Sequence, residues 1–159
     1  MKPRPCVTVA LFANVMVVAL APVLLSFAPG LGSMIYDAYS SFCHQIEARS
    51  FSWAGHALPL CARCTGLWLG AFWFAALTRL RRLRPSAGIL LVWFMVLDWS
   101  LARLGATPDF AIERFLTGVS GGLGAGILST WLWRRCRASI RFGSSRLELS
   151  AARSSSPPS

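Results

Sequence analysis

The stretch LPLCARCTGLWLGAFWFAALT, residues 58–78, combines two properties that decide the fold. It is apolar over about 20 residues, which is the length that a helix needs to cross the hydrocarbon core of a bilayer. Near its start stands a Cys-x-x-Cys pair, Cys61 and Cys64, with Arg63 between the two thiols. The stretch therefore predicts a membrane helix that carries reactive groups at its N-terminal end.

Three further apolar segments of similar length accompany this one. Apolar residues make up 55% of the 159 residues and charged residues only 14%, a balance that is too apolar for a soluble domain of this size. The additional helices are predicted at about residues 7–28, 86–104 and 115–133. Because the first apolar run is longer than the core of a signal peptide and no A-x-A-like site ends it, we expect an uncleaved anchor.

These segments predict an all-α fold, a four-helix transmembrane bundle with one long outer loop between the first and second helices. Residues 1–142 would form this single integral membrane domain. The remainder, residues 143–159, is rich in Ser, Arg and Pro and is predicted to be a disordered tail. No soluble domain is expected beside the bundle.

The basic residues indicate the orientation of the bundle. Twelve of the 16 stand at the N-terminus, in the second connection or in the C-terminal tail, namely Lys2, Arg4, Arg79, Arg81, Arg82, Arg84, Arg134, Arg135, Arg137, Arg141, Arg146 and Arg153. Because Lys and Arg are retained on the cytoplasmic side, both termini are expected in the cytoplasm of a multi-pass protein of a bacterial inner membrane. The net charge of +10 is then explained by topology and by contact with anionic lipid, and no nucleic-acid partner is expected.

The long outer loop, residues 29–57, holds further reactive side chains. Cys43, His44 and His56 lie in it, so with this topology they share the outer side with Cys61 and Cys64. A helix N-terminus favours the thiolate form of the Cys-x-x-Cys pair, and three thiolates with one imidazole make a four-coordinate zinc site. The leading hypothesis is a metal site, for zinc or another thiophilic metal, that is either structural or used in metal handling. Its ligands would be Cys43, His44, Cys61 and Cys64, with His56 as the alternative fourth ligand.

Two other hypotheses stay open for the same cysteines. In one, Cys61 and Cys64 exchange disulfides with Cys43 as partner thiol, which would make the protein a membrane thiol–disulfide oxidoreductase with quinone as the alternative cofactor. The architecture is similar to that of the quinone-linked disulfide-generating membrane oxidoreductases, although the second outer loop here lacks their second cysteine pair. In the other, a structural disulfide staples the loop of an accessory membrane subunit. Metal binding without catalysis is the preferred expectation, and Cys6 and Cys136 are expected to be plain reduced thiols.

Two charged groups are expected inside the membrane. Asp98 and Arg63 each lie roughly 8–9 Å from the outer end of their predicted helices, at about 1.5 Å per residue. A lone charge at this depth costs about 3 kcal/mol on insertion scales. The matching depth therefore predicts a structural Asp98–Arg63 ion pair, and the functional alternative is a proton or ion relay near the thiols.

Glycines recur at intervals of four on two of the predicted helices, Gly66 and Gly70 on one and Gly118, Gly122 and Gly126 on the other. Small residues at this spacing let helix backbones approach closely in lipid. The pattern predicts a tight contact between these two helices. The alternative is a homodimer, or a contact with a partner membrane protein, through Gly118, Gly122 and Gly126.

The string FCHQIEARSFSWAGHALPLCARCTG, residues 42–66, resembles the signature CHQ…RSF…PLCARCTG of the domain-of-unknown-function family 2085, which comprises small prokaryotic multi-pass membrane proteins. The resemblance extends over residues 42–122 and is carried by Cys43, His44, Gln45, Arg49, Ser50, Phe51, Gly55, Pro59, Cys61, Arg63, Cys64, Thr65, Gly66, Gly70, Asp98, Arg114, Thr117 and Gly118. Where the family has a Gly after the Asp and an Asn three residues before the Arg, this chain has Trp99 and Ala111. The resemblance implies a multi-pass membrane protein and adds no activity.

Overall fold

The computed structural model describes residues 5–77, 80, 82–105 and 110–154. Within them the α-helices are α1 (Pro5–Phe27), α2 (Pro29–Ser40), α3 (Ala62–Ala76), α4 (Pro85–Arg103) and α5 (Ala111–Ser154). A short 3-10 helix, η1 (Glu47–Arg49), and an antiparallel hairpin of β1 (Ser52–Trp53) and β2 (His56–Ala57) lie between α2 and α3. The residues used in the sequence predictions that lie outside the described ranges are Lys2, Arg4, Thr78, Arg79, Arg81 and residues 155–159.

Three of the described helices are long and apolar enough to cross a membrane, namely Pro5–Phe27, Pro85–Arg103 and the Ala111–Arg137 part of α5. The prediction of a mostly helical chain with membrane-length helices is thereby confirmed. A bundle of four spanning helices is not confirmed, because α3 has only 15 residues. At 1.5 Å per residue it is about 22 Å long, which is shorter than the ~30 Å of a typical hydrocarbon core.

The short length of α3 has a local cause. Leu58, where the sequence predicts the helix to begin, donates its N–H to the Phe51 carbonyl at 2.8 Å. Pro59 follows, and a residue that precedes proline is kept out of the helical region. The chain therefore stays non-helical as far as Cys61, whose φ of −64° and ψ of 159° make it the N-cap of α3. The opening of the apolar stretch forms part of the loop instead of the helix.

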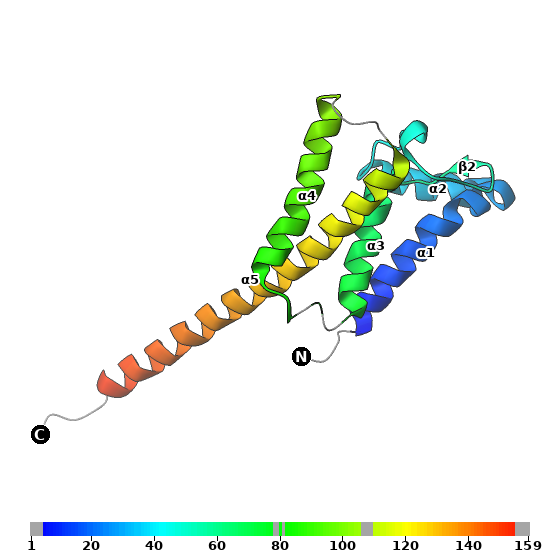
Figure 1. Cartoon of the computed structure of the whole chain (residues 1–159). Coiled ribbons are helices and arrows are strands. Elements are labelled where there is room, and N and C mark those ends of the chain that lie inside the picture. Colours follow the sequence, from blue (N-terminus) through cyan, green and yellow to red (C-terminus); the bar gives the residue numbers. More distant parts are fainter. Residues whose placement is uncertain (1–4, 78–79, 81, 106–109, 155–159) are drawn as a thin grey trace, which may run out of the picture.

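α3 and α5 approach each other closely through their glycines. A Cβ added at Gly66 would collide with the Phe115 carbonyl oxygen, and one added at Gly122 would collide with the Leu67 carbonyl oxygen. α4 packs against the other side of α5, and α1 packs against α3. The two glycine-bearing helices, α3 and α5, therefore form the middle of the molecule (Figure 1). Gly118 and Gly126 also face α3 within the same chain, and the glycine spacing is therefore used in an intramolecular contact.

Replacing Gly66 by alanine is expected to destabilise the protein by roughly 1–3 kcal/mol, the usual cost of forcing extra atoms into a packed interior. The new methyl group would meet backbone atoms of α5, which cannot rotate away. The thermal unfolding midpoint in detergent should therefore fall. Gly30→Ala is the matched control, because nothing lies within 4 Å of a Cβ at Gly30, and equal midpoints for the two variants would contradict the close helix contact.

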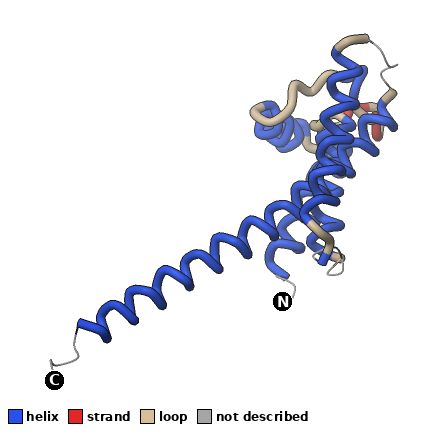
Figure 2. Tube along the Cα trace, turned by 60° about the vertical axis from the view of Figure 1, so that its left-hand side comes forward, coloured by secondary structure: helices blue, strands red, loops and turns tan. Residues whose placement is uncertain are grey.

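The segment between α1 and α3 gathers at one end of the helices, which we call the loop end (Figure 2). The end of α4 and the start of α5 also lie there, whereas the start of α1, the end of α3 and the start of α4 lie at the opposite end (Figure 1). Asn14 Nδ2 of α1 donates to the Tyr39 hydroxyl of α2 at 2.9 Å. The Tyr36 hydroxyl donates to the Ala57 carbonyl of the hairpin. These bonds hold α2 and the hairpin over the ends of the helices.

The C-terminal part of α5 differs from the prediction. The sequence predicts a disordered tail from residue 143, but the helix continues through Ser154 and projects well beyond the other helices (Figures 1 and 2). Extending an existing helix avoids the cost of nucleation. The final segment RLELSAAR, residues 146–153, consists mostly of residues with high helix propensity. Local propensity therefore outweighs the polar composition that predicts disorder.

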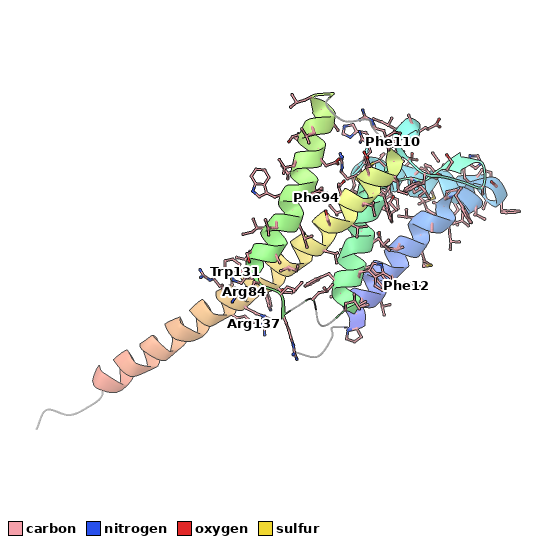
Figure 3. The ribbon with its side chains drawn as sticks, viewed as in Figure 1. Phe12, Arg84, Phe94, Phe110, Trp131 and Arg137 are labelled. Atoms are coloured by element: carbon pink, nitrogen blue, oxygen red, sulfur yellow. The ribbon has the colours of Figure 1, made fainter. Side chains whose placement is uncertain are left out.

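The outward surfaces of the helices are apolar, as expected for lipid-facing segments. Phe12 of α1 is 48% exposed and Phe94 of α4 is 57% exposed (Figure 3). Arg84, Trp131 and Arg137 lie toward the end opposite the loop end. Aromatic and basic side chains are enriched where a membrane helix meets the headgroups, so this level of the molecule has the composition of a membrane boundary.

Candidate metal or redox site

Three cysteines come together at the loop end. The Sγ atoms of Cys43, Cys61 and Cys64 all lie within 4.8 Å of one another. Cys43 follows α2, Cys61 caps α3 and Cys64 lies in the first turn of α3. The backbone N–H of Cys61 donates to the Cys43 sulfur at 3.2 Å, across a separation of 18 residues. The fold therefore brings the Cys-x-x-Cys pair and the distant third thiol into one group.

Packing and an unusual backbone conformation hold the third cysteine in place. Cys43 is buried against Val18 of α1 and Leu60 of the loop. Just beyond it, Gln45 has a φ of 50°, a left-handed conformation that is uncommon for residues other than glycine. The Gln45 side chain donates to the Tyr36 carbonyl at 2.5 Å. The chain thus turns sharply after the Cys-His-Gln string, and a side-chain hydrogen bond stabilises that turn.

The environment of Cys61 favours its thiolate form. A hydrogen bond from the Cys64 thiol is the largest cause that lowers the pKa of Cys61, which falls from 9.0 to about 5. Backbone N–H groups at the start of α3 and the Cys43 thiol lower this pKa further, whereas partial burial raises it. A thiolate is the form of cysteine that binds metals and attacks disulfides. Either chemistry can therefore start from the Cys61 sulfur.

The two histidines lie in different places. His44 is exposed and lines the same cavity of about 350 Å³ as Cys43, Cys61 and Cys64. His56 belongs to the hairpin, is paired in register with Trp53, and lines a separate cavity. Within the described residues, neither imidazole belongs to the close group of three sulfurs. Of the two histidines that the sequence suggests as fourth ligand, only His44 shares a cavity with the thiols.

All five cysteines are free thiols in the structure. Cys6 and Cys136 are exposed and lie outside the thiol group. The three cysteines at the loop end are also unbridged, although their sulfurs are close together. The site therefore has the composition of a three-thiol ligand set or of a dithiol redox pair with a third thiol beside it.

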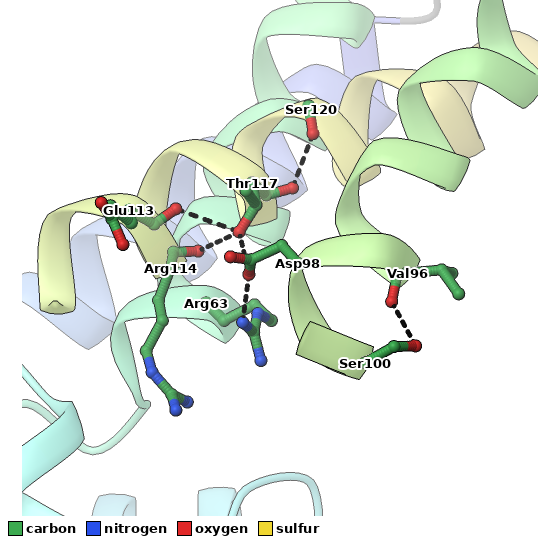
Figure 4. A network of polar contacts seen from close by, with 8 residues as sticks. All are labelled: Arg63, Val96, Asp98, Ser100, Glu113, Arg114, Thr117 and Ser120. Atoms are coloured by element: carbon green, nitrogen blue, oxygen red, sulfur yellow. Dashed lines mark hydrogen bonds and ion pairs between the residues drawn. The ribbon is translucent and has the colours of Figure 1, made fainter. Parts of the chain in front are cut away.

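A polar network that includes Arg63, the residue before Cys64, joins α3, α4 and α5 (Figure 4). Arg63 Nη2 of α3 forms an ion pair with Asp98 Oδ2 of α4, and the two side chains are 13% and 18% exposed. The Thr117 hydroxyl of α5 lies 3.0 Å from the same carboxylate oxygen. Asp98 thereby links three helices at the level of the cysteines.

Sequence reasoning did not anticipate the contact of Thr117 with Asp98. The residue is 5% exposed and stands in the Arg-Phe-Leu-Thr-Gly string that contributes to the family resemblance. Thr117 lies one helical turn after Glu113, and its hydroxyl can also donate to the Glu113 carbonyl at 3.0 Å. This local spacing does not indicate a partner on another helix. The contact depends on how α4 and α5 pack.

A second cavity of about 500 Å³ adjoins the site and is apolar. Leu60 and Thr65, which flank the Cys-x-x-Cys pair in the sequence, line it together with Val18, Phe51 and Trp68. Val18 and Leu60 also contact Cys43. The thiol group therefore borders a polar cavity directly and an apolar cavity through Leu60.

These features define a class, that of helical membrane proteins with a cluster of three thiols at one end of the helices. The apolar helices are those of a membrane protein, and the group of Cys43, Cys61 and Cys64 is the feature that marks the candidate site. The chain belongs to the family of predicted membrane proteins DUF2085, whose family model matches residues 43–128. The family suggested by the Cys-His-Gln and Cys-Ala-Arg-Cys-Thr-Gly strings is confirmed.

Two relatives share this part of the chain. An uncharacterized protein of Methanothermobacter thermautotrophicus is 30% identical over 101 residues, which cover 60% of this chain and 91% of the relative. Uncharacterized protein MJ1492 of Methanocaldococcus jannaschii is 32% identical over 95 residues, which cover 55% of this chain and 61% of the relative. No solved structure matches the chain. Both relatives come from archaea, so they give no support to the expectation of a bacterial inner membrane.

Proposed function

We propose that Cys43, Cys61 and Cys64 bind a thiophilic metal ion, with zinc as the first candidate. The observation that carries this proposal is the convergence of three sulfurs within 4.8 Å. Tetrahedral zinc with Zn–S bonds of about 2.3 Å holds its sulfurs about 3.8 Å apart. Side-chain adjustments of about 1 Å therefore suffice to bring the thiols to coordination distance.

The fourth ligand in this proposal comes from the polar cavity. His44 lines that cavity together with the three cysteines, so rotation of an exposed side chain can bring its imidazole toward them. His56 would require movement of the hairpin, since it lines a different cavity. A bound ion would tie the loop to the start of α3. The site would serve either to stabilise the loop end or to hold a metal ion for transfer.

The same proposal places the site on the extracytoplasmic face of a cell membrane. α3 runs alongside α1 between the loop end and the opposite end (Figure 1), which supports a four-helix bundle despite its short length. The described basic residues Arg82, Arg84, Arg134, Arg135 and Arg137 belong to the connection and helix segment away from the loop end. This supports cytoplasmic termini. A homodimer would have to use a face other than the glycines, since these contact α3.

Metal analysis of the protein purified in detergent tests this proposal. We expect about one zinc ion, or one ion of another thiophilic metal, per chain, and we expect the thiols to react with a maleimide only after a chelator has removed the ion. A metal-free protein that contains a reversibly reducible Cys61–Cys64 disulfide would contradict the metal site and support thiol–disulfide exchange. A metal-free protein with a disulfide that resists mild reductants would support a structural bridge in an accessory subunit.

Thiol–disulfide exchange is the second candidate function, and the apolar cavity beside Leu60 favours it. In this mechanism Cys61 and Cys64 would lose two electrons and two protons as they form a disulfide. A quinone in the apolar cavity would accept both and become a quinol. Cys43 would serve as the third thiol that receives or passes on the disulfide. Addition of a soluble quinone to the reduced protein should then produce one quinol per disulfide formed.

A further inference from the structure

The polar cavity at the loop end is lined by arginines from four different elements. Arg49 comes from η1, Arg63 from α3, Arg103 from α4 and Arg114 from α5. The cavity has a volume of about 350 Å³, so four arginine side chains border a small space. Figure 4 shows the Arg63 guanidinium against Asp98 and the Arg114 side chain extending away from this pair.

The charge of this cavity is positive whether or not a metal occupies the cysteines. Among the described residues that line it there is no aspartate or glutamate. Three thiolates with a divalent ion carry a net charge of −1, and Asp98, which pairs with Arg63, adds −1. The four arginines carry +4. The local sum is therefore about +2 with a metal, and it is also about +2 without one when Cys61 is a thiolate and the other two thiols are neutral, since arginine stays protonated in proteins.

Two of these arginines, Arg63 and Arg114, lie in largely buried surroundings close to other positive charges. Arg114 is only 8% exposed, and its charge is repelled by those of Arg63 and Arg49 and attracted by Cys61 and Asp98. The Nε of Arg63 is buried and has no hydrogen-bond acceptor among the residues that the structure describes. Burying a charge or a polar donor is costly unless it is paired. An anion in the cavity would reduce the repulsion among these arginines.

We propose that this cavity binds a phosphate group. The planar fork of a guanidinium matches the oxygens of phosphate, which several arginines can contact at once. The exposed side chains of Arg49 and Arg103 would contact the ligand at the mouth of the cavity, and Arg63 and Arg114 would lie deeper. The phosphate could be a soluble ion or the headgroup of a membrane lipid, since both carry the same chemistry. The proposal goes beyond the metal site and does not require it.

Titration calorimetry with the full-length protein in phosphate-free detergent solution tests the proposal. The two probes are inorganic phosphate and the short-chain lipid dihexanoylphosphatidylglycerol. We expect saturable binding of about one equivalent, weakened roughly tenfold in Arg103→Gln, because the variant loses a charged hydrogen-bond donor to the phosphate. Binding of inorganic phosphate identifies a soluble ligand, whereas binding of the lipid alone identifies a headgroup. Binding of neither probe would overturn the proposal.

Two controls make the result specific to the cavity. Arg84→Gln removes an exposed arginine away from the loop end, and its affinity should equal that of the wild type. Arg49→Gln, also at an exposed position, should weaken binding as Arg103→Gln does, and both variants should keep the wild-type circular dichroism spectrum. Equal affinities for Arg103→Gln and Arg84→Gln would overturn the proposed site. Chelator-treated protein should bind the same probe, so failure of the metal site alone would leave this result intact.

Discussion

Cys61→Ser is expected to reduce the metal content of the purified protein from about one ion per chain to nearly none. The three sulfurs lie within 4.8 Å of one another, and a serine hydroxyl stays protonated at neutral pH, so the variant would offer only two thiolates. Thiophilic metals select sites by their soft ligands. Cys43→Ser and Cys64→Ser should have the same effect, because each removes one of the same three sulfurs.

The measurement is elemental analysis of protein purified without chelators, supported by cobalt substitution. Cobalt bound to thiolates absorbs in the near ultraviolet, so its spectrum reports the sulfur ligands directly. Cys6→Ser and Cys136→Ser are matched controls, since both cysteines are exposed and lie outside the thiol group. These controls should retain the wild-type metal content. A full complement of metal in Cys43→Ser would show that the third thiol is not a ligand.

Asp98→Ala is expected to destabilise the protein by roughly 3–5 kcal/mol, the usual cost of removing one partner of a buried ion pair. The Arg63 and Asp98 side chains are 13% and 18% exposed. The alanine variant would leave a largely buried guanidinium without its carboxylate partner and would also remove the acceptor that lies near Thr117. The free energy of unfolding, measured by denaturant titration in mixed micelles, should therefore fall sharply.

Two further variants separate this charge effect from a general loss of packing. Asp37→Ala removes an exposed carboxylate from α2 and should change the stability by less than about 0.5 kcal/mol. The double variant Arg63→Met/Asp98→Leu replaces the pair by apolar side chains and should recover most of the lost stability. If Asp98→Ala is no less stable than Asp37→Ala, the ion pair does not contribute to the packing of α3 on α4.

The sequence predicts the local parts of the candidate site well. Cys61 and Cys64 are three residues apart at a helix start, and that spacing alone puts them on one face. Arg63 and Asp98 lie at matching depths in their predicted helices, and the structure has them in contact. Residues 58–61 are the exception, because their apolar character predicts helix although a proline and the adjacent hairpin keep them extended.

The sequence by itself determined that this is a helical membrane protein with close helix contacts. A bilayer sets the length of an apolar helix that crosses it, and the helical repeat sets the spacing of small residues on one face. The tertiary structure alone decided which distant residues share a site. Cys43 meets Cys61 across 18 residues, and Arg49, Arg63, Arg103 and Arg114 meet around one cavity. Such convergence depends on loop conformation and on how helices pack, and neither has a periodic signature in the sequence.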